Sequence, residues 1–242
     1  MKERVINFKD IRKFKPFNPC AHSESVLYID KNEVLKILDP CFTKSRKETV
    51  EELSKIKHSH LITPLYSIIM DDQFSGYAMK YYKKYISLDK KIIDPSIPYK
   101  QRQIIAKQIW EILDFFKKIN FSFIDLHEDN VIIDDEFDLQ FLDLDSGHFK
   151  KSIDKDNLEL KYASKRVCIM TLNILFGVRP ISFYENFEKN ESTIRSMMSN
   201  NQNILFERAL SEPKEINGLE LIDEFDEETV NNIKRKLKLI LY

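Results

Sequence analysis

Glycine is scarce in this chain of 242 residues. The sequence has only four glycines, at Gly76, Gly147, Gly177 and Gly218, whereas an average protein contains about 7% glycine. None lies before Gly76. Glycine lets a backbone approach a bound phosphate closely, because no Cβ intervenes. A glycine-rich phosphate-binding turn is therefore excluded from the segment before Gly76.

Cysteines and long apolar runs are also few. No two cysteines form a C-x-x-C pair, and the three of them are Cys20, Cys41 and Cys168. Neither a zinc site nor a disulfide framework is predicted. The N-terminus turns polar at Asn7, unlike a signal peptide, and the uncharged runs at 61–70 and 167–178 are too short to span a bilayer. We expect a cytoplasmic protein with no membrane span.

Neither sign of charge is in surplus. The 38 basic and 39 acidic residues nearly cancel, to a net charge of −1, whereas nucleic-acid binding needs a basic surface. We therefore predict no nucleic-acid partner. The hydrophobic content of 43% excludes a generally disordered chain, and the length allows one large domain or two lobes.

The first part of the chain has the patterns of β-strands. Strand-like segments separated by turn residues occupy 14–17, 25–29, 33–38, 66–70 and the residues from Gly76 onward. Residues 1–15 fit either a short helix or an extra strand. Within this part, Ser45–Lys57 carries Val50, Leu53 and Ile56 on one face of a predicted helix.

The remainder of the chain is mostly helical. Apolar residues recur at helical spacing over Gln101–Ile119, and Lys165–Phe176 is predicted as a second long helix closed by Gly177. Between these helices, Val131–Ile133 and Leu139–Leu142 have the pattern of a short hairpin.

These patterns together predict an α+β fold in two parts. A β-rich domain occupies residues 1–82, and a mostly helical domain occupies residues 83–242. Residues 181–242 complete the helical domain, with the last helix near 227–241, and the sequence assigns them no other role.

One stretch, Phe123–Asn130, concentrates polar residues of the kind that phosphoryl transfer needs. Asp125 is followed five positions later by Asn130, and the predicted hairpin ends in Asp143. In phosphoryl transfer one carboxylate accepts the proton of a hydroxyl, while an amide and a second carboxylate hold Mg²⁺. Asp145 is an alternative metal ligand, but Asp143 is preferred because it directly follows the predicted strand.

This stretch resembles the catalytic loop and metal-binding segment of the protein-kinase-like superfamily, whose signatures are H-R-D-L-x-x-x-N and D-F-G. Leu126 matches the leucine of the first signature, and His127 makes the loop similar also to that of aminoglycoside- and choline-type phosphotransferases and of Rio-like kinases. The resemblance covers residues 14–178. It implies a two-lobed fold, with a small antiparallel β lobe carrying one main helix and a larger helical lobe. It also implies ATP and Mg²⁺ as cofactors.

Lys36 resembles the strand lysine that orients the α- and β-phosphates in this superfamily. In the family that lysine pairs with a glutamate from the next helix. The candidates here are Glu48, Glu51 and Glu52, although family spacing puts Thr49 at the expected position. Glu52 is preferred because it lies nearest the apolar face of the predicted helix.

The same resemblance implies contacts with the nucleotide at the end of the β lobe. Met79 would lie at the back of the nucleotide pocket. Tyr81 and Tyr82 would belong to the hinge whose backbone binds adenine. By the same comparison Asp125 is the catalytic base, and Asn130 and Asp143 are the metal ligands.

Four departures from the family pattern bear on function. Residues Phe17–Ser23 contain no glycine, Phe123-Ile124 replaces His-Arg, Leu144-Asp145 replaces Phe-Gly, and no A-P-E segment occurs. We therefore predict an atypical kinase that transfers the γ-phosphate of ATP to a hydroxyl, with protein Ser or Thr narrowly favoured as the acceptor. The alternatives are a small-molecule phosphotransferase and a pseudokinase that acts as a binding module.

Overall fold

A computed structural model of the chain describes residues 1–17, 24–151, 158–178, 189–211 and 218–241. The fold combines helices with a mixed β-sheet and divides into two compact units. The first unit comprises Met1–Tyr85 with Gln140–Phe149, and the second comprises Ile86–Leu139 with Lys150–Tyr242. The predicted α+β class is confirmed. Residues 140–149, which the sequence patterns assign to the helical domain, belong to the first unit.

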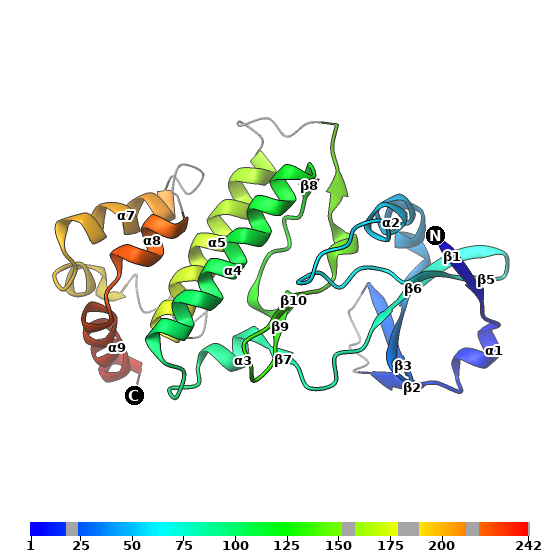
Figure 1. Cartoon of the computed structure of the whole chain (residues 1–242), viewed down its shortest axis with the longest axis horizontal. Coiled ribbons are helices and arrows are strands. Elements are labelled where there is room, and N and C mark those ends of the chain that lie inside the picture. The colour runs from blue at the N-terminus through cyan, green and yellow to red at the C-terminus, as the bar shows by residue number, and fades with distance from the viewer. Residues whose placement is uncertain (18–23, 152–157, 179–188, 212–217, 242) are drawn as a thin grey trace. The chain divides into compact units, whose positions relative to one another are not determined.

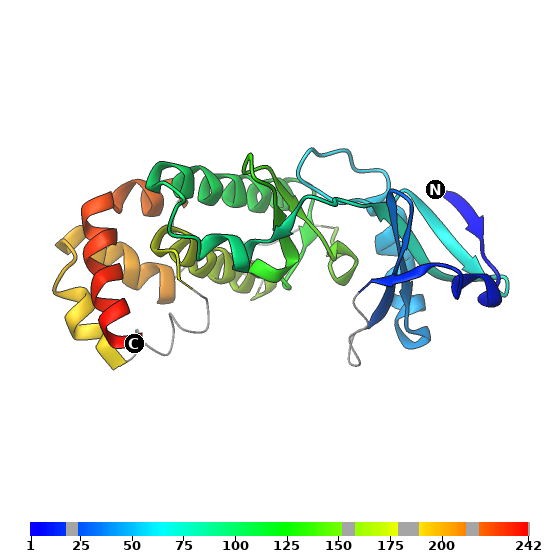
Figure 2. The same ribbon diagram turned by 90° about the horizontal axis from the view of Figure 1, so that it is seen from below.

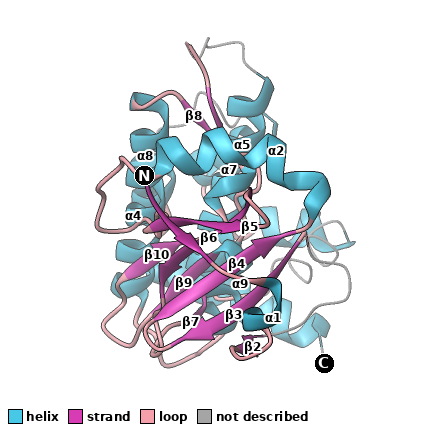
Figure 3. Ribbon diagram, turned by 90° about the vertical axis from the view of Figure 1, so that its right-hand side faces the viewer, coloured by secondary structure: helices cyan, strands magenta, loops and turns pink. Residues whose placement is uncertain are grey.

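The first unit is built on a six-stranded sheet, ordered β1-β5-β6-β4-β3-β2 (Figure 3). Its strands are β1 (Lys2–Val5), β2 (Lys15–Phe17), β3 (Ser25–Asp30), β4 (Glu33–Leu38), β5 (Tyr66–Met70) and β6 (Gln73–Lys80). β1 pairs with β5 in parallel, and the other ladders are antiparallel. The expectation of a purely antiparallel lobe is therefore wrong at β1. Two parallel strands that pair are far apart in sequence, so no hairpin turn between them indicates the pairing.

Two helices belong to this unit, α1 (Phe8–Ile11) and α2 (Pro40–Leu53). Residues 1–15 thus hold both the strand and the helix that were alternatives. α2 begins before the predicted Ser45, because the Asp39 side chain caps it by accepting a hydrogen bond from Cys41 N at 3.0 Å. Pro40 fits the first helical turn, where its missing N–H is not needed.

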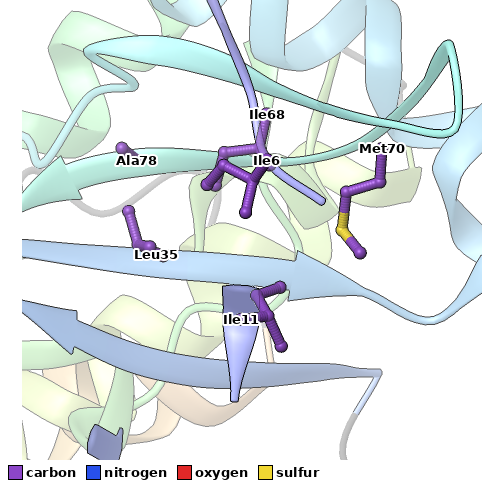
Figure 4. Packing of buried hydrophobic residues seen from close by; sticks show 6 residues of the cluster. All are labelled: Ile6, Ile11, Leu35, Ile68, Met70 and Ala78. Carbon is purple, nitrogen blue, oxygen red and sulfur yellow. The ribbon is translucent and has the colours of Figure 1, made fainter. Parts of the chain in front are cut away.

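One face of the sheet carries the apolar core that Figure 4 shows. Its six buried residues are Ile6, Ile11, Leu35, Ile68, Met70 and Ala78. Leu35 and Ala78 lie directly opposite each other on β4 and β6. Neighbouring side chains of a strand point to opposite faces, so Lys36 and its partner Tyr77 lie on the other face. The apolar core thus fixes the register that sets Lys36 beside Tyr77.

The second unit is mainly helical. Its elements are β7 (Ile86–Ser87), α3 (Leu88–Ile92), α4 (Tyr99–Lys118), β8 (Phe121–Ser122), β9 (Val131–Ile133), α5 (Leu158–Phe176), α7 (Asn200–Ser211), α8 (Gly218–Glu224) and α9 (Glu227–Leu241). The strand β10 (Leu139–Phe141) crosses from this unit into the first, which also contains β11 (His148–Phe149). α4 and α5 lie side by side (Figures 1 and 2). None of the described helices is long and apolar enough to cross a bilayer.

Polar contacts hold α4 against its neighbours. Trp110 Nε1 of α4 donates to Thr171 Oγ1 of α5 at 2.9 Å. The guanidinium of Arg102, also from α4, is buried and donates to the carbonyls of Ile92, Asp94 and Ile174 at 2.6, 2.6 and 3.0 Å. Burial lowers the pKa of Arg102 to about 10. These carbonyls therefore stabilise a charge that the sequence pattern would place at the surface.

Candidate active site

The Lys36 ammonium is buried on β4 and contacts two carboxylates within the first unit. Its Nζ lies 2.7 Å from Asp145 Oδ1 and 3.1 Å from Asp143 Oδ1. Burial by itself would lower the pKa of Lys36, but the charges of Asp145 and Asp143 outweigh it and raise that pKa. Lys36 therefore stays protonated.

The structure gives Lys36 different partners from the predicted Glu52. The Glu52 carboxylate lies 2.5 Å from Lys55 Nζ and is 45% exposed, since α2 buries Thr49, Val50 and Leu53 instead. Thr49, at the position that family spacing indicates, donates through Oγ1 to the Gly147 carbonyl at 3.1 Å. The predicted pairing of Lys36 with Glu52 is therefore not the one that this structure has.

Asp145 is fixed by three donors. Besides Lys36, the Tyr77 hydroxyl donates to Asp145 Oδ1 at 2.7 Å, and Arg46 Nη1 donates to the Asp145 carbonyl at 2.8 Å. Burial, followed by the charges of Asp145 and Asp143, raises the pKa of Tyr77 well above its ordinary value. The phenol thus remains a neutral donor. Sequence reasoning missed Tyr77 and Arg46, because neither has a motif of its own.

Asp143 is held differently, mainly through its backbone. Its φ of 59° is left-handed, a conformation that aspartate tolerates better than most residues. Ser146 N and Oγ donate to the Asp143 carbonyl at 3.3 and 3.1 Å, closing the turn of Leu144–Ser146. The Asp143 side chain is 39% exposed, against 3% for Asp145. Asp143 therefore presents the more open carboxylate.

Backbone pairing anchors these carboxylates in the first unit. Phe141 N donates to the His60 carbonyl, and Ile62 N donates to the Phe141 carbonyl, each at 2.9 Å. Gln140 Nε2 adds a 2.8 Å bond to the Ser59 carbonyl. These contacts explain why residues 140–149 pack with the β-sheet. They join segments far apart in sequence, so local patterns do not predict them.

The predicted catalytic loop is an ordered turn of the second unit. Asn130 Nδ2 donates to the Asp125 carbonyl at 2.8 Å and to Asp125 Oδ2 at 3.0 Å. His127 Nε2 lies 3.3 Å from Asp125 Oδ1, and its Nδ1 lies 3.8 Å from Asp129 Oδ2. The Asp125 side chain remains 53% exposed. The loop thus presents an accessible carboxylate whose orientation neighbouring side chains constrain.

Apolar residues support this loop from beneath. Phe123 is buried and packs edge-on against Phe116 of α4, with ring centroids 6.0 Å apart, and stacks on Phe121 at 6.2 Å. Leu126 is also buried, whereas Ile124 is 44% exposed. Phe123, which stands at the histidine position of the family signature, therefore acts as a core residue of the helical unit.

The residues predicted to contact the nucleotide lie at the end of β6. Met79 is buried and lies opposite Val34 of β4. Tyr81 N donates to the Asn32 carbonyl at 2.9 Å, so this amide already has a partner within the unit. The Tyr82 ring packs against Tyr85, with centroids 4.8 Å apart. The Tyr81 amide is therefore already bonded and is not free to donate to an adenine base in the way that the resemblance implied.

The described residues do not test two of the predictions, the phosphate-binding segment and the metal ligands. The segment 18–23, which contains no glycine and is predicted to form a turn, lies outside the described residues. Of the two predicted metal ligands, Asn130 belongs to the second unit and Asp143 to the first. Among the described residues no group of three or more His, Cys, Asp or Glu side chains is placed to hold a metal. The predicted metal ligands thus remain predictions.

Comparisons with known proteins add no family assignment. Neither a scan against protein-family models nor a search of curated proteins finds a match to this chain. The resemblance to protein-kinase-like enzymes therefore stays an interpretation of the residues named above.

Within the predicted catalytic loop, the buried acid Glu128 affects stability in a way that can be tested. Asn173 Nδ2 donates to Glu128 Oε1 at 2.8 Å, and Asn173 Oδ1 is buried without a partner among the described residues. Burial raises the pKa of Glu128, and the bond from Asn173 only partly opposes this. Ionised Glu128 therefore costs stability once the pH exceeds its ordinary pKa, and the full cost is present above the raised pKa.

We expect Glu128→Gln to stabilise the protein by about 1 kcal/mol at pH 8. The amide removes the buried charge and supplies a donor that can reach Asn173 Oδ1. At pH 5 the gain should shrink, because a larger fraction of Glu128 is then neutral. Denaturant unfolding at both pH values measures this, with Glu111→Gln, an exposed site on α4, as the control. An equal gain at both pH values, or a loss at pH 8, would contradict the burial argument.

Proposed function

We propose that this protein is an atypical phosphotransferase with a two-lobed, kinase-like fold, which uses ATP and Mg²⁺. The observation that carries the proposal is the contact between Lys36 and Asp143, residues 107 positions apart. Each was assigned from its own motif, one as the phosphate-binding lysine and the other as a metal ligand. A lysine and a metal-binding carboxylate that act on one triphosphate need to lie close together.

The two carboxylates beside Lys36 could bind a metal cation that is itself bound to phosphate. Two carboxylates, Asp143 and Asp145, face one ammonium group and leave a surplus of negative charge. Mg²⁺ prefers oxygen ligands and is commonly held by one or two carboxylates together with phosphate oxygens. In this proposal Asp143 would hold Mg²⁺ in the first unit, and the metal would neutralise charge on the phosphates; Asn130, in the second unit, is proposed separately as a metal ligand. Lys36 binds phosphate oxygens directly.

Asp125 is the catalytic base of the proposal. A base needs a carboxylate that the acceptor hydroxyl can reach, and the Asp125 side chain is 53% exposed. The bonds from Asn130 to the Asp125 carbonyl and carboxylate fix its orientation. Positioning of this kind accounts for much of enzymatic phosphoryl transfer.

The acceptor is proposed to be a hydroxyl group. The sequence narrowly favoured protein Ser or Thr, but α5 begins at Leu158, before the predicted Lys165. Fewer residues therefore remain after Asp143 to bind a peptide. This observation favours a small-molecule hydroxyl as the acceptor, with protein Ser or Thr as the second candidate.

Nucleotide binding is the first test. We expect ATP with Mg²⁺ to raise the apparent melting temperature, because a ligand that binds only the folded state adds RT ln(1 + [L]/Kd), about 2.7 kcal/mol at 100 times Kd. The shift should fall when EDTA removes Mg²⁺ or when Lys36 is changed to Met. If millimolar ATP causes no shift with Mg²⁺ present, the phosphotransferase proposal fails. Binding without transfer to any hydroxyl compound would favour the pseudokinase.

A further inference from the structure

We propose that Asp145 is the residue that positions Lys36, in the role that the kinase resemblance gives to a helix glutamate. This inference rests on the proposed function, and it goes beyond it by assigning separate roles to the two carboxylates that contact Lys36. Asp145 orients the lysine permanently, and Asp143 is left for the metal.

The contacts of Asp145 suit a fixed positioning group. Its Oδ1 accepts hydrogen bonds from Lys36 Nζ and from the Tyr77 hydroxyl, each at 2.7 Å. Arg46 Nη1 holds the Asp145 carbonyl at 2.8 Å, and the side chain is 3% exposed. This carboxylate cannot turn toward a ligand without losing the bonds from Lys36 and Tyr77, and the Arg46 bond fixes the backbone that carries it.

The Asp143 backbone is also held, but its side chain is less restrained than that of Asp145. Among the described residues its carboxylate accepts one hydrogen bond, from Lys36 at 3.1 Å, and its side chain is 39% exposed. A carboxylate with one partner and access to solvent can exchange that partner for a cation at small cost. The two acids therefore differ in the property that separates a positioning group from a metal ligand.

The arrangement of α2 shows why the lysine needs a substitute partner. Glu52 pairs with Lys55, and the buried position near Gly147 is held by Thr49, which carries no charge. α2 instead reaches the segment around Asp145 through Arg46. The helix thus supports the carboxylate that contacts Lys36 and does not supply it. Strand register completes the set, since Tyr77 lies directly opposite Lys36.

A double-mutant cycle in the nucleotide-free protein tests the first half of the inference. The variants are Asp145→Asn, Lys36→Met and both together, with Asp143→Asn as the matched comparison. We expect Asp145→Asn to lower the folding equilibrium constant roughly tenfold or more, because it leaves a buried ammonium poorly paired. In the Lys36→Met background most of this loss should disappear. Asp143→Asn should cost much less, since the Asp143 side chain is 39% exposed.

Steady-state kinetics, at a temperature where every variant is folded, test the second part of the inference, namely that Asp145 positions Lys36 for ATP and Asp143 binds the metal. We expect Asp145→Asn to raise the KM for ATP roughly tenfold and to leave the Mg²⁺ requirement unchanged. Asp143→Asn should instead raise the Mg²⁺ concentration that gives half-maximal rate. Tyr77→Phe, which removes one donor to Asp145, should raise the KM for ATP by a smaller factor.

The outcomes separate this inference from the proposed function. Additive losses in the cycle, or an unchanged KM for ATP in Asp145→Asn, overturn the positioning role while phosphoryl transfer by the wild type stands. A shift in the Mg²⁺ requirement with Asp145→Asn, and none with Asp143→Asn, reverses the two assignments. If the wild type does not bind ATP, the phosphotransferase proposal fails and the positioning role fails with it, even where the cycle shows coupling.

Discussion

Asp125→Asn is expected to reduce kcat for phosphoryl transfer by about 10² to 10⁴-fold. The asparagine amide has nearly the same shape as the carboxylate, but it cannot accept the proton of the acceptor hydroxyl. Asn130 Nδ2 bonds the carbonyl of residue 125 as well as its side chain, so the loop should keep its conformation. ATP binding should therefore remain near that of the wild type.

The measurement combines steady-state kinetics with a thermal-shift titration of ATP and Mg²⁺. Asp129→Asn is the matched control, because Asp129 belongs to the same loop and its side chain is 70% exposed. We expect that control to keep kcat within about twofold of the wild type, since exposed groups without a role in the reaction contribute little. Loss of ATP binding in Asp125→Asn would show that Asp125 acts on the nucleotide. An unchanged kcat would remove it from the reaction.

Elements with a strong local pattern could be predicted from the sequence. β4 spans the predicted 33–38, and α4 differs from the predicted Gln101–Ile119 by a few residues at its ends. The apolar residues of α4 recur at helical spacing along one buried face. β4 is a short, mostly apolar run between turn residues and is buried on both faces. The end of α5 was also predictable, because Gly177 adopts a φ of 61° directly after it.

Contacts between distant segments could not be predicted in this way. Asp145 has the appearance of an ordinary turn aspartate in sequence. Its segment is held in the first unit by contacts with distant residues, such as the pairing of Phe141 with His60 and Ile62. Arg102 likewise has the appearance of an exposed arginine, because its acceptors are backbone carbonyls that no sequence pattern shows. The family resemblance indicated that an acidic side chain pairs with Lys36, but it pointed to Glu52 of α2, whereas the partners are Asp143 and Asp145.

The scarcity of glycine makes Gly76 informative, because it marks a place where a side chain does not fit. Gly76 lies on β6 next to Tyr77 and has a φ of 157°. A Cβ there would lie 2.0 Å from the Lys36 carbonyl oxygen and 3.1 Å from Ile37 Cα. These are backbone atoms of the neighbouring strand, so the clash cannot be relieved by turning a side chain. The register between β5 and β6 also shifts beside it, between Ile68 and Ile69.

Gly76→Ala is therefore expected to destabilise the protein by about 3 kcal/mol or more, which exceeds the usual effect of a point mutation. Relief of the clash requires β4 to move at Lys36, so the variant should also lose much of the ATP-dependent thermal shift. Denaturant unfolding and the ATP titration measure the two effects. Ser75→Ala, at the preceding and partly exposed position, is the control and should stay within about 0.5 kcal/mol of the wild type.

The two effects of Gly76→Ala need not occur together, and their combination is informative. A destabilised variant that binds ATP as tightly as the wild type would show that the backbone at Lys36 can move without consequence for the nucleotide. That result would argue against Lys36 as a phosphate ligand, because its ammonium is aimed by the strand that carries it. Loss of both stability and ATP binding would instead show that the close packing of β6 on β4 at Gly76 is needed to position Lys36 for the nucleotide. A variant as stable as the wild type would show that β6 and β4 can separate locally without loss of the fold.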